Sequence, residues 1–197
     1  MKFLKYLVIF LAVIIVIIAI LSFVAPTEVK VSRSITIDAP RETVWEYVNS
    51  LEEMHQWSPW AEKDPDMKLE YRGTKGKVGS VYSWDGDPET VGKGEQEITS
   101  IQAPSRIESE LRFLTPYESK ADAYVQLDET GSGSTRVTYG FESVSPRPMN
   151  VLNLFMNMDE MVGPDFEAAM SNLKKLVESG SFTEKETTQM EDEFKQY

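Results

Sequence analysis

Residues 35–60 read ITIDAPRETVWEYVNSLEEMHQWSPW, and in this stretch the sequence changes from a strand-like to a helix-like pattern. At its start and just before it, four apolar residues share one parity and alternate with polar ones: Val29, Val31, Ile35 and Ile37. A period of two predicts a half-buried strand. Pro40 suits the first turn of a helix, and apolar residues after it recur at helical spacing. We therefore predict one helix over about 41–49 and a second short helix near 51–56.

The end of this stretch, HQWSPW at 55–60, contains the single histidine of the chain. A Ser-His-acid triad would have to use His55, but Pro59 follows the neighbouring Ser58 and no G-x-S-x-G elbow surrounds it. We therefore predict no catalytic residue, and we interpret His55 as a histidine at a helix end. Pro59 is expected to end the helical turn, and the two tryptophans are expected to close one end of the fold.

Six further strands follow, separated by turns rich in glycine and proline. Their expected ranges are 67–73, 79–85, 91–102, 106–114, 118–128 and 134–142. In the strand at 106–114, Ile107, Leu111 and Phe113 alternate with charged residues, which is typical of an antiparallel sheet with one face in water. Together with the first strand, the sequence predicts a curved antiparallel sheet of about seven strands.

The chain becomes helical after the last strand, in SPRPMNVLNLFMNMDEMVGPDFEAAMSNLKKLVESG at 145–180. We expect a break near Gly163-Pro164 and a stop at Gly180, because glycine readily adopts the conformation that ends a helix. Apolar residues at helical spacing follow the break, so this helix would cover the apolar face of the sheet and give an α+β fold. Residues 181–197 are polar and acidic, and we predict a flexible tail there.

The N-terminus contains two lysines and then an apolar run at 7–25 that only Ser22 interrupts. As a helix the run is about 28 Å long, close to the ~30 Å hydrocarbon thickness of a bilayer. A cleaved signal peptide is the alternative, but its apolar region is usually only about 7–15 residues long, and the bulky Phe23 fits a cleavage site poorly. We predict a single transmembrane anchor followed by a domain at 28–180. By the positive-inside rule, residues 1–6 would lie in the cytoplasm and the domain on the extracytoplasmic side of a bacterial inner or cytoplasmic membrane.

The composition of the chain excludes several classes of function. There is no cysteine, which rules out disulfides, thiolate catalysis and cysteine metal sites. One histidine cannot form the usual zinc sets, and DGDPE at 85–89 lacks the spacing of a calcium loop, so we predict no metal and no cofactor. The formal net charge of −12 would repel nucleic acid, and no nucleic-acid partner is expected. The sequence predicts no particular protein partner.

Five stretches of the chain together resemble a known superfamily. They are the opening ITIDAPRETVWEYVNSLEEMHQWSPW, then KVGSVYSWDGD, GKGEQEITSIQAPSRIESELRF and STRVTYGFES, and the closing GPDFEAAMSNLKKLVE. This order is similar to that of the START-related SRPBCC superfamily, which includes polyketide cyclase/dehydrase-like and lipid-transport-like proteins. The resemblance covers about 30–179, and the predicted membrane anchor is an addition to the basic pattern. It implies a helix-grip fold that holds a hydrophobic molecule between the sheet and the C-terminal helix, and it implies no catalytic residue.

Aromatic and methionine side chains are concentrated in segments that such a fold would turn toward its interior. We predict that eleven of them contact a hydrophobic ligand: Trp57, Trp60, Tyr82, Trp84, Phe113, Tyr124, Tyr139, Phe155, Met158, Phe166 and Met170. For each residue alone the alternative is an ordinary place in the core, because aromatic residues dominate core burial. The segment LFMNMDEM at 154–161 is interpreted as a lid over the pocket or as a surface that touches lipid.

Three hypotheses about function follow from these observations. The first is a membrane-tethered domain that binds a hydrophobic small molecule or a lipid. The second is an enzyme of the cyclase or hydrolase type that uses Tyr82, Tyr124 or His55 for acid–base chemistry on a hydrophobic substrate. The third is a non-catalytic interaction or stress-response module in which the aromatic residues are simply core.

Overall fold

The computed structural model describes residues 2–131 and 133–180, and the predicted flexible tail at 181–197 lies outside the described residues. The helices are α1 (Lys2–Val24), α2 (Arg41–Trp45), α3 (Leu51–His55), α4 (Trp60–Lys63), the 3-10 helix η1 (Met149–Leu154) and α5 (Met158–Glu178). The strands are β1 (Glu28–Ile37), β2 (Lys68–Arg72), β3 (Val81–Asp85), β4 (Lys93–Gln102), β5 (Arg106–Thr115), β6 (Ser119–Glu129) and β7 (Thr135–Val144).

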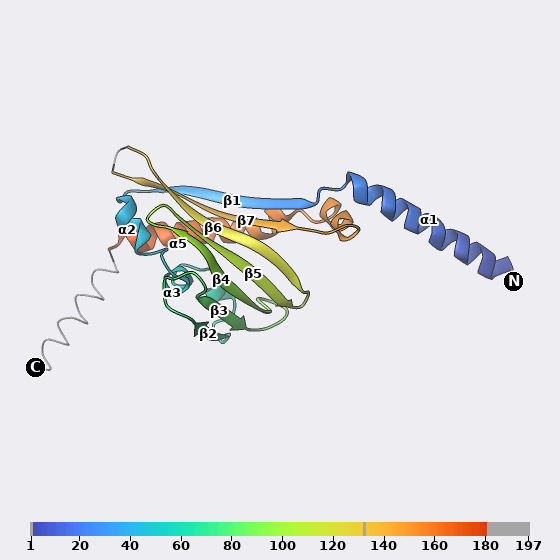
Figure 1. The fold of residues 1–197 in the computed structure, drawn as a ribbon, viewed down its shortest axis with the longest axis horizontal. Coiled ribbons are helices and arrows are strands. Elements are labelled where there is room, and N and C mark those ends of the chain that lie inside the picture. Colours follow the sequence, from blue (N-terminus) through green and yellow to red (C-terminus); the bar gives the residue numbers. More distant parts are fainter. Residues whose placement is uncertain (1, 132, 181–197) are drawn as a thin grey trace, which may run out of the picture.

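The strands form a seven-stranded antiparallel sheet in the order β1-β7-β6-β5-β4-β3-β2. Strands β2 to β7 pair with their neighbours along the chain, and β1 pairs with β7 at the end of the sheet. Helix α5 lies along β1 and β7 on one face of the curved sheet, which we call the inner face (Figure 1). Helices α2 and α3 lie at the end of the sheet far from α1 (Figure 1). This arrangement confirms the predicted α+β fold with about seven strands and a long C-terminal helix.

The core lies between the inner face and the C-terminal half of α5. Alternation along the strands and helical spacing along α5 place apolar side chains on the same side, and these are fully or almost fully buried: Ile37, Val44, Val48, Ile98, Ile107, Val125, Leu127, Val137, Ala169, Met170, Leu173 and Val177. Burying one large aliphatic side chain stabilises a fold by roughly 1.5–3 kcal/mol. This apolar stripe therefore holds α5 against the sheet.

The predicted break near Gly163-Pro164 is wrong, because α5 continues through both residues. The break falls instead at residues 155–157, between η1 and α5, where the side chain of Asn157 caps α5 by accepting a hydrogen bond from the backbone N–H of Glu160. Pro164 is the seventh residue of α5, where a proline removes one backbone hydrogen bond, and the helix continues past it. The expected stop at Gly180 is confirmed, since this residue has a φ of 66° directly after the helix.

The helical region after β1 differs from the prediction in two details. The helix expected over 41–49 is shorter, because α2 ends at Trp45 and turns follow it. Pro59 does not end a helical turn but precedes the short helix α4, which no sequence pattern predicted. The second helix is close to its predicted range, and the hydroxyl of Ser50 caps it by accepting a hydrogen bond from the N–H of Glu53 at 3.3 Å.

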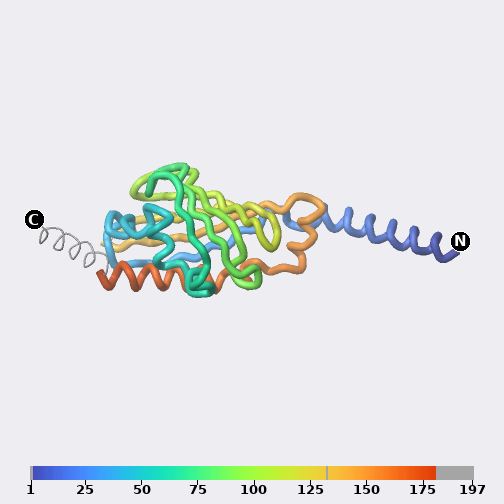
Figure 2. Tube along the Cα trace, turned by 90° about the horizontal axis from the view of Figure 1, so that it is seen from below, coloured from blue at the N-terminus to red at the C-terminus, as the bar shows by residue number. Residues whose placement is uncertain are grey.

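Helix α1 projects away from the domain along the direction of β1 (Figures 1 and 2). Its side chains are mostly exposed, and Ser22 in its last turn is buried. Its 23 residues and its apolar composition are sufficient for crossing a membrane. Anchors and signal sequences share these properties.

Candidate ligand-binding face

Four aromatic side chains form a continuous row across the inner face of β2, β3 and β5, and we call them the aromatic row: Tyr71, Tyr82, Trp84 and Phe113. The ring centroids of Tyr71 and Tyr82 are 5.3 Å apart, those of Tyr82 and Trp84 are 5.7 Å apart, and those of Trp84 and Phe113 are 6.0 Å apart. Cross-strand pairing produces the row, because Tyr71 lies opposite Tyr82 on the neighbouring strand.

Trp84 keeps its place in the row because the residue opposite it on β4 is Gly94. A Cβ at Gly94 would lie 2.5 Å from the Trp84 ring and 2.6 Å from the carbonyl oxygen of Arg112. The indole N–H of Trp84 donates a hydrogen bond to the carbonyl of Val91 at 3.1 Å. The hydrogen bond to Val91 therefore orients the indole, and the lack of a side chain at Gly94 leaves room for the ring.

The aromatic row remains partly accessible because α5 lies over β1 and β7 rather than over β2 and β3. Tyr71 is 40% exposed, and Tyr82 and Phe113 are half-buried. Gln96 on the same face donates a hydrogen bond to the hydroxyl of Ser109 at 2.7 Å, which places one polar pair among the apolar side chains. An apolar surface with a few oriented polar groups is the usual lining of a small-molecule site.

A second set of aromatic side chains joins α4 and β7 to α5. Phe166 of α5 stacks on Tyr139 of β7 with 4.5 Å between the ring centroids, and Trp60 meets the edge of Phe166 at 5.9 Å. Trp57 packs edge-on against Tyr139 at 5.6 Å. Trp57 and Phe166 are only 2% and 3% exposed, so these rings belong to the core. Burial raises the pKa of Tyr139 to about 12, and its hydroxyl stays neutral in the physiological range.

Helix α4 and the turn after it form a bridge from α5 to the loop between β3 and β4. Lys63 forms an ion pair with Asp165 of α5 at 2.6 Å. The carboxylate of Asp64 accepts a hydrogen bond from the backbone N–H of Asp87 at 2.8 Å. Such ion pairs are individually weak, and the contact of Trp60 with Phe166 also holds the bridge on α5.

His55 of α3 lies beside the aromatic row, with its ring centroid 5.7 Å from that of Tyr82. Burial lowers the pKa of His55, and burial followed by the neighbouring Tyr71 raises the pKa of Tyr82. Both side chains are therefore neutral near pH 7. Within residues 2–131 and 133–180 no group of His, Asp and Glu side chains is arranged to hold a metal ion. This electrostatic environment suits an uncharged, apolar molecule.

The structure separates the eleven predicted ligand residues into several groups. Tyr82, Trp84 and Phe113 lie in the aromatic row, whereas Trp57, Trp60, Tyr139 and Phe166 form the second set and Met170 is in the core. Phe155 is 78% exposed between η1 and α5, and Met158 is half-buried in the first turn of α5. Tyr71 was missed, although its alternation with Leu69 in the strand at 67–73 could have indicated it.

The expectation that Tyr124 faces the interior is wrong. Tyr124 lies opposite Gly140 on the outer face of the sheet, because its neighbours Ala123 and Val125 occupy the inner face. The guanidinium of Arg106 stacks over its ring at 4.2 Å. The aromatic ring fills the space that Gly140 leaves on this face, so Tyr124 has a packing role away from the aromatic row.

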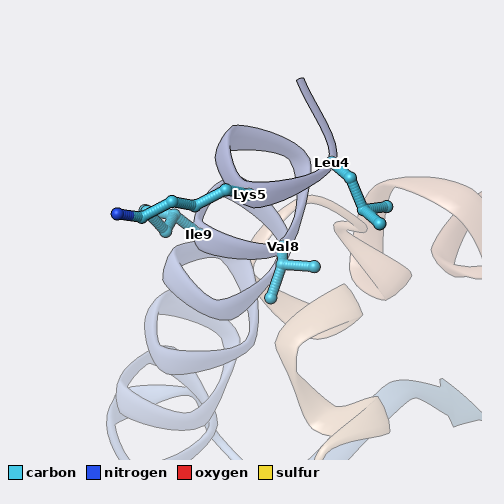
Figure 3. A pocket seen from close by; sticks show the side chains of 4 residues that line it. All are labelled: Leu4, Lys5, Val8 and Ile9. Atoms are coloured by element: carbon cyan, nitrogen blue, oxygen red, sulfur yellow. The ribbon is translucent and has the colours of Figure 1, made fainter. Parts of the chain in front are cut away.

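Two surface hollows occur elsewhere on the described residues. One, of about 350 Å³, is open to its surroundings and lined by Leu4, Lys5, Val8 and Ile9 on α1, whose side chains point outward (Figure 3). The other, of about 270 Å³, lies on the outer face, where charged side chains such as Lys30, Lys120 and Glu142 line it. Neither of these two hollows lies between the sheet and α5, where the sequence predicts the ligand pocket.

This chain is similar to a known protein family and to several solved structures. Residues 28–178 match the family described as polyketide cyclase/dehydrase and lipid transport. A structure from Nitrosospira multiformis is 18% identical, with a TM-score of 0.57, over 78% of this chain and 99% of its own. Norcoclaurine synthase from Thalictrum flavum, solved with dopamine and hydroxybenzaldehyde, is 14% identical, with a TM-score of 0.58, over 81% and 92%.

A major latex-like protein from Panax ginseng is also similar, at 14% identity and a TM-score of 0.52, over 76% of this chain and 97% of its own. No curated protein sequence matches the chain. At such low identities the structural likeness concerns the fold alone. It confirms the predicted helix-grip fold. The family match over residues 28–178 confirms the resemblance to the START-related superfamily.

Proposed function

The chain belongs to the polyketide cyclase/dehydrase and lipid transport family, and from this premise we propose that it is a membrane-tethered domain that binds a hydrophobic small molecule or lipid. Family membership makes residues 28–178 a domain of the hydrophobic-ligand-binding or cyclase type. The observation that carries the finer proposal is the aromatic row, which is apolar, partly accessible and not covered by α5. The ligand would lie against the row, with Gln96 and Ser109 as the nearby polar pair.

Deeper entry of the ligand, between the aromatic row and α5, would require the bridge formed by α4 to move away from α5. The interactions that hold the bridge on its α5 side are the Lys63–Asp165 ion pair and the contact of Trp60 with Phe166. Separation of the bridge would open the region between the aromatic row and α5. The predicted lid at 154–161 is not needed for this step, because α4 itself lies over that side of the inner face.

The tether in this proposal is α1, with the N-terminus in the cytoplasm and the domain on the extracytoplasmic side. Its apolar length and exposed surface support a membrane span. Lys2 and Lys5 ahead of the apolar run support the proposed orientation. The experiment is alkaline extraction of membranes that contain the full-length protein, followed by determination of the intact mass. Retention in the membrane with residues 1–25 present is the expected result, whereas a soluble product without them would identify a signal peptide.

Ligand binding is tested on the purified full-length protein by native mass spectrometry and by solvent extraction of bound molecules. We expect a hydrophobic molecule to accompany the protein, and we expect Tyr71→Ala and Phe113→Ala to reduce its occupancy. Tyr124→Leu is the matched control, because this ring lies on the opposite face. Protein that is empty in every preparation, and that shows no thermal shift with a panel of lipids and polyketides, would contradict the proposal.

The enzyme alternative rests on His55 beside Tyr82, because Tyr124 lies on the other face of the sheet. Burial lowers the pKa of His55 and raises the pKa of Tyr82, so both side chains are neutral near pH 7. No observation on the described residues therefore favours this alternative over binding.

A further inference from the structure

The segment between β7 and α5 differs from the rest of this acidic chain. No aspartate or glutamate occurs between Glu142 and Asp159, although the formal net charge of the chain is −12. Five large apolar side chains in this segment are exposed, and we call them the apolar segment: Met149, Leu152, Leu154, Phe155 and Met156. Contiguous exposed apolar side chains on a soluble domain mark a surface that contacts another apolar surface.

The apolar segment is fixed to the end of α1 by hydrogen bonds. The side-chain amide of the fully buried Asn150 donates to the carbonyls of Ser22 and Ala25, at 2.8 and 2.9 Å. Arg147 donates to the same Ser22 carbonyl at 2.9 Å, and its guanidinium lies 5.3 Å from the centre of the Phe23 ring. The last carbonyls of a helix lack partners within the helix, and a cation there also interacts favourably with the helix dipole.

These contacts determine where the apolar segment lies relative to a membrane that α1 crosses. Val16 is the middle residue of the apolar run at 7–25, and Ser22 is about 9 Å further along the helix axis. The hydrocarbon core extends only about 15 Å from the centre of the bilayer. A segment hydrogen-bonded to Ser22 and Ala25 is therefore held near the boundary between the acyl chains and the headgroups.

We propose that the apolar segment inserts into the bilayer leaflet on the domain's side, so that the domain contacts the membrane through a second, non-spanning element. Leu152 and Phe155 lie among the acyl chains, and the guanidinium of Arg147, bonded to the Ser22 carbonyl, lies at the boundary between the acyl chains and the headgroups. The inference rests on the tether in the proposed function. The acidic domain is repelled by anionic headgroups, so the contact depends on apolar burial rather than on charge.

The experiment uses the full-length protein in phosphatidylcholine vesicles. Because the chain has no cysteine, each of four variants carries a single thiol for a polarity-sensitive fluorophore: Leu152→Cys, Phe155→Cys, Val16→Cys and Lys77→Cys. Val16 reports on the tether, and Lys77 is the exposed control in the loop between β2 and β3, at the other end of the sheet. Quenching is measured with lipids that carry a nitroxide near the headgroup or near the end of the acyl chain.

The proposal predicts blue-shifted emission at Leu152 and Phe155, with strong loss of fluorescence from the shallow nitroxide. It predicts deep quenching at Val16 and no quenching at Lys77. Quenching at Val16 alone overturns this inference and leaves the tether intact, whereas no quenching at any position refutes both. Blue-shifted emission at Leu152 and Phe155 without nitroxide quenching would mean that protein, a second copy or a partner, covers the segment, and it too overturns the proposal.

Discussion

The guanidinium of Arg33 on β1 lies directly against Gly163 of α5, so that a Cβ added to this glycine would stand 2.3 Å from Nη2 of Arg33. Arg33 donates hydrogen bonds to Asp159 and to Glu167, each at 2.8 Å. The two carboxylates flank Gly163 and Pro164 along the helix. The arginine therefore connects the turns before and after the position where a break was expected.

The first prediction concerns this contact. Replacing a glycine inside a helix by alanine normally stabilises the helix by about 1 kcal/mol. In an Arg33→Ala background, Gly163→Ala should give that gain in the free energy of unfolding. In the wild-type background the gain should be smaller or absent, because the new methyl group displaces Arg33 from Asp159 and Glu167. Denaturant unfolding of the four proteins measures the coupling, and equal effects of Gly163→Ala in both backgrounds would contradict it.

The second prediction separates packing from ligand binding on the sheet. Gly140→Ala should destabilise the domain, because a Cβ at Gly140 would lie 2.2 Å from the ring of Tyr124, which Arg106 covers on its other side. Tyr124→Leu should lower the melting temperature through loss of the contact with Arg106, which is worth about 0.5–1 kcal/mol at exposed sites. Neither variant should change affinity for a hydrophobic ligand. A Tyr124→Leu protein of normal stability that binds no ligand would refute the assignment to the outer face.

The third prediction is a pH dependence that only the single histidine can cause. Since burial lowers the pKa of His55 in the folded protein, the unfolded chain binds more protons than the folded one just below pH 6.5. Stability should therefore fall as the pH drops from about 7.5 to 5.5. His55→Gln should reduce this fall. Melting temperatures of both proteins across this range provide the measurement, and parallel curves would mean that His55 has a similar pKa in the folded and unfolded states.

The fourth prediction concerns the connection between α1 and the domain. In Asn150→Asp a carboxylate replaces the amide that donates to the carbonyls of Ser22 and Ala25. The carbonyl oxygens of Ser22 and Ala25 would then face a carboxylate instead of a donor, at the negative end of the helix dipole. This loss should lower the free energy of unfolding by about 1–3 kcal/mol. Hydrogen–deuterium exchange should become faster in a peptide that covers residues 22–27. Asn172→Asp, in the middle of α5, is the control and should leave exchange in that peptide unchanged.

Sequence periodicity was sufficient to predict the main helices and strands, but it did not predict which face of the sheet each side chain occupies. The seven strands and the C-terminal helix follow from local alternation and helical spacing, which the chain obeys throughout. Parity within one strand, however, does not say which parity faces α5. Tyr124 and the small apolar residues Ala123 and Val125 have opposite parities in one strand, and the structure turns Ala123 and Val125 inward.

Long-range contacts account for the other differences. Glycine and proline at 163–164 indicate a helix break locally, but α5 continues there, and Arg33 of β1 bonds to carboxylates on both sides of the two residues. The hydrogen bonds of Asn150 join residues more than a hundred positions apart along the chain, and no local pattern could show them. Whether the aromatic row is open or covered depends on how far α5 extends across the sheet, which is also a tertiary property.

The direct continuation of α1 into β1 also has a mechanical consequence (Figure 1). A pull along α1 is first borne by the hydrogen bonds of Asn150 and Arg147 to the end of the helix. Beyond them it enters β1 at Glu28, and the partners of β1 on β7 run from Val144 to Thr135. The hydrogen bonds between these two strands are then loaded together in shear instead of being opened one after another. With α1 as the proposed tether, the domain would resist tension from the bilayer over the whole length of its first strand.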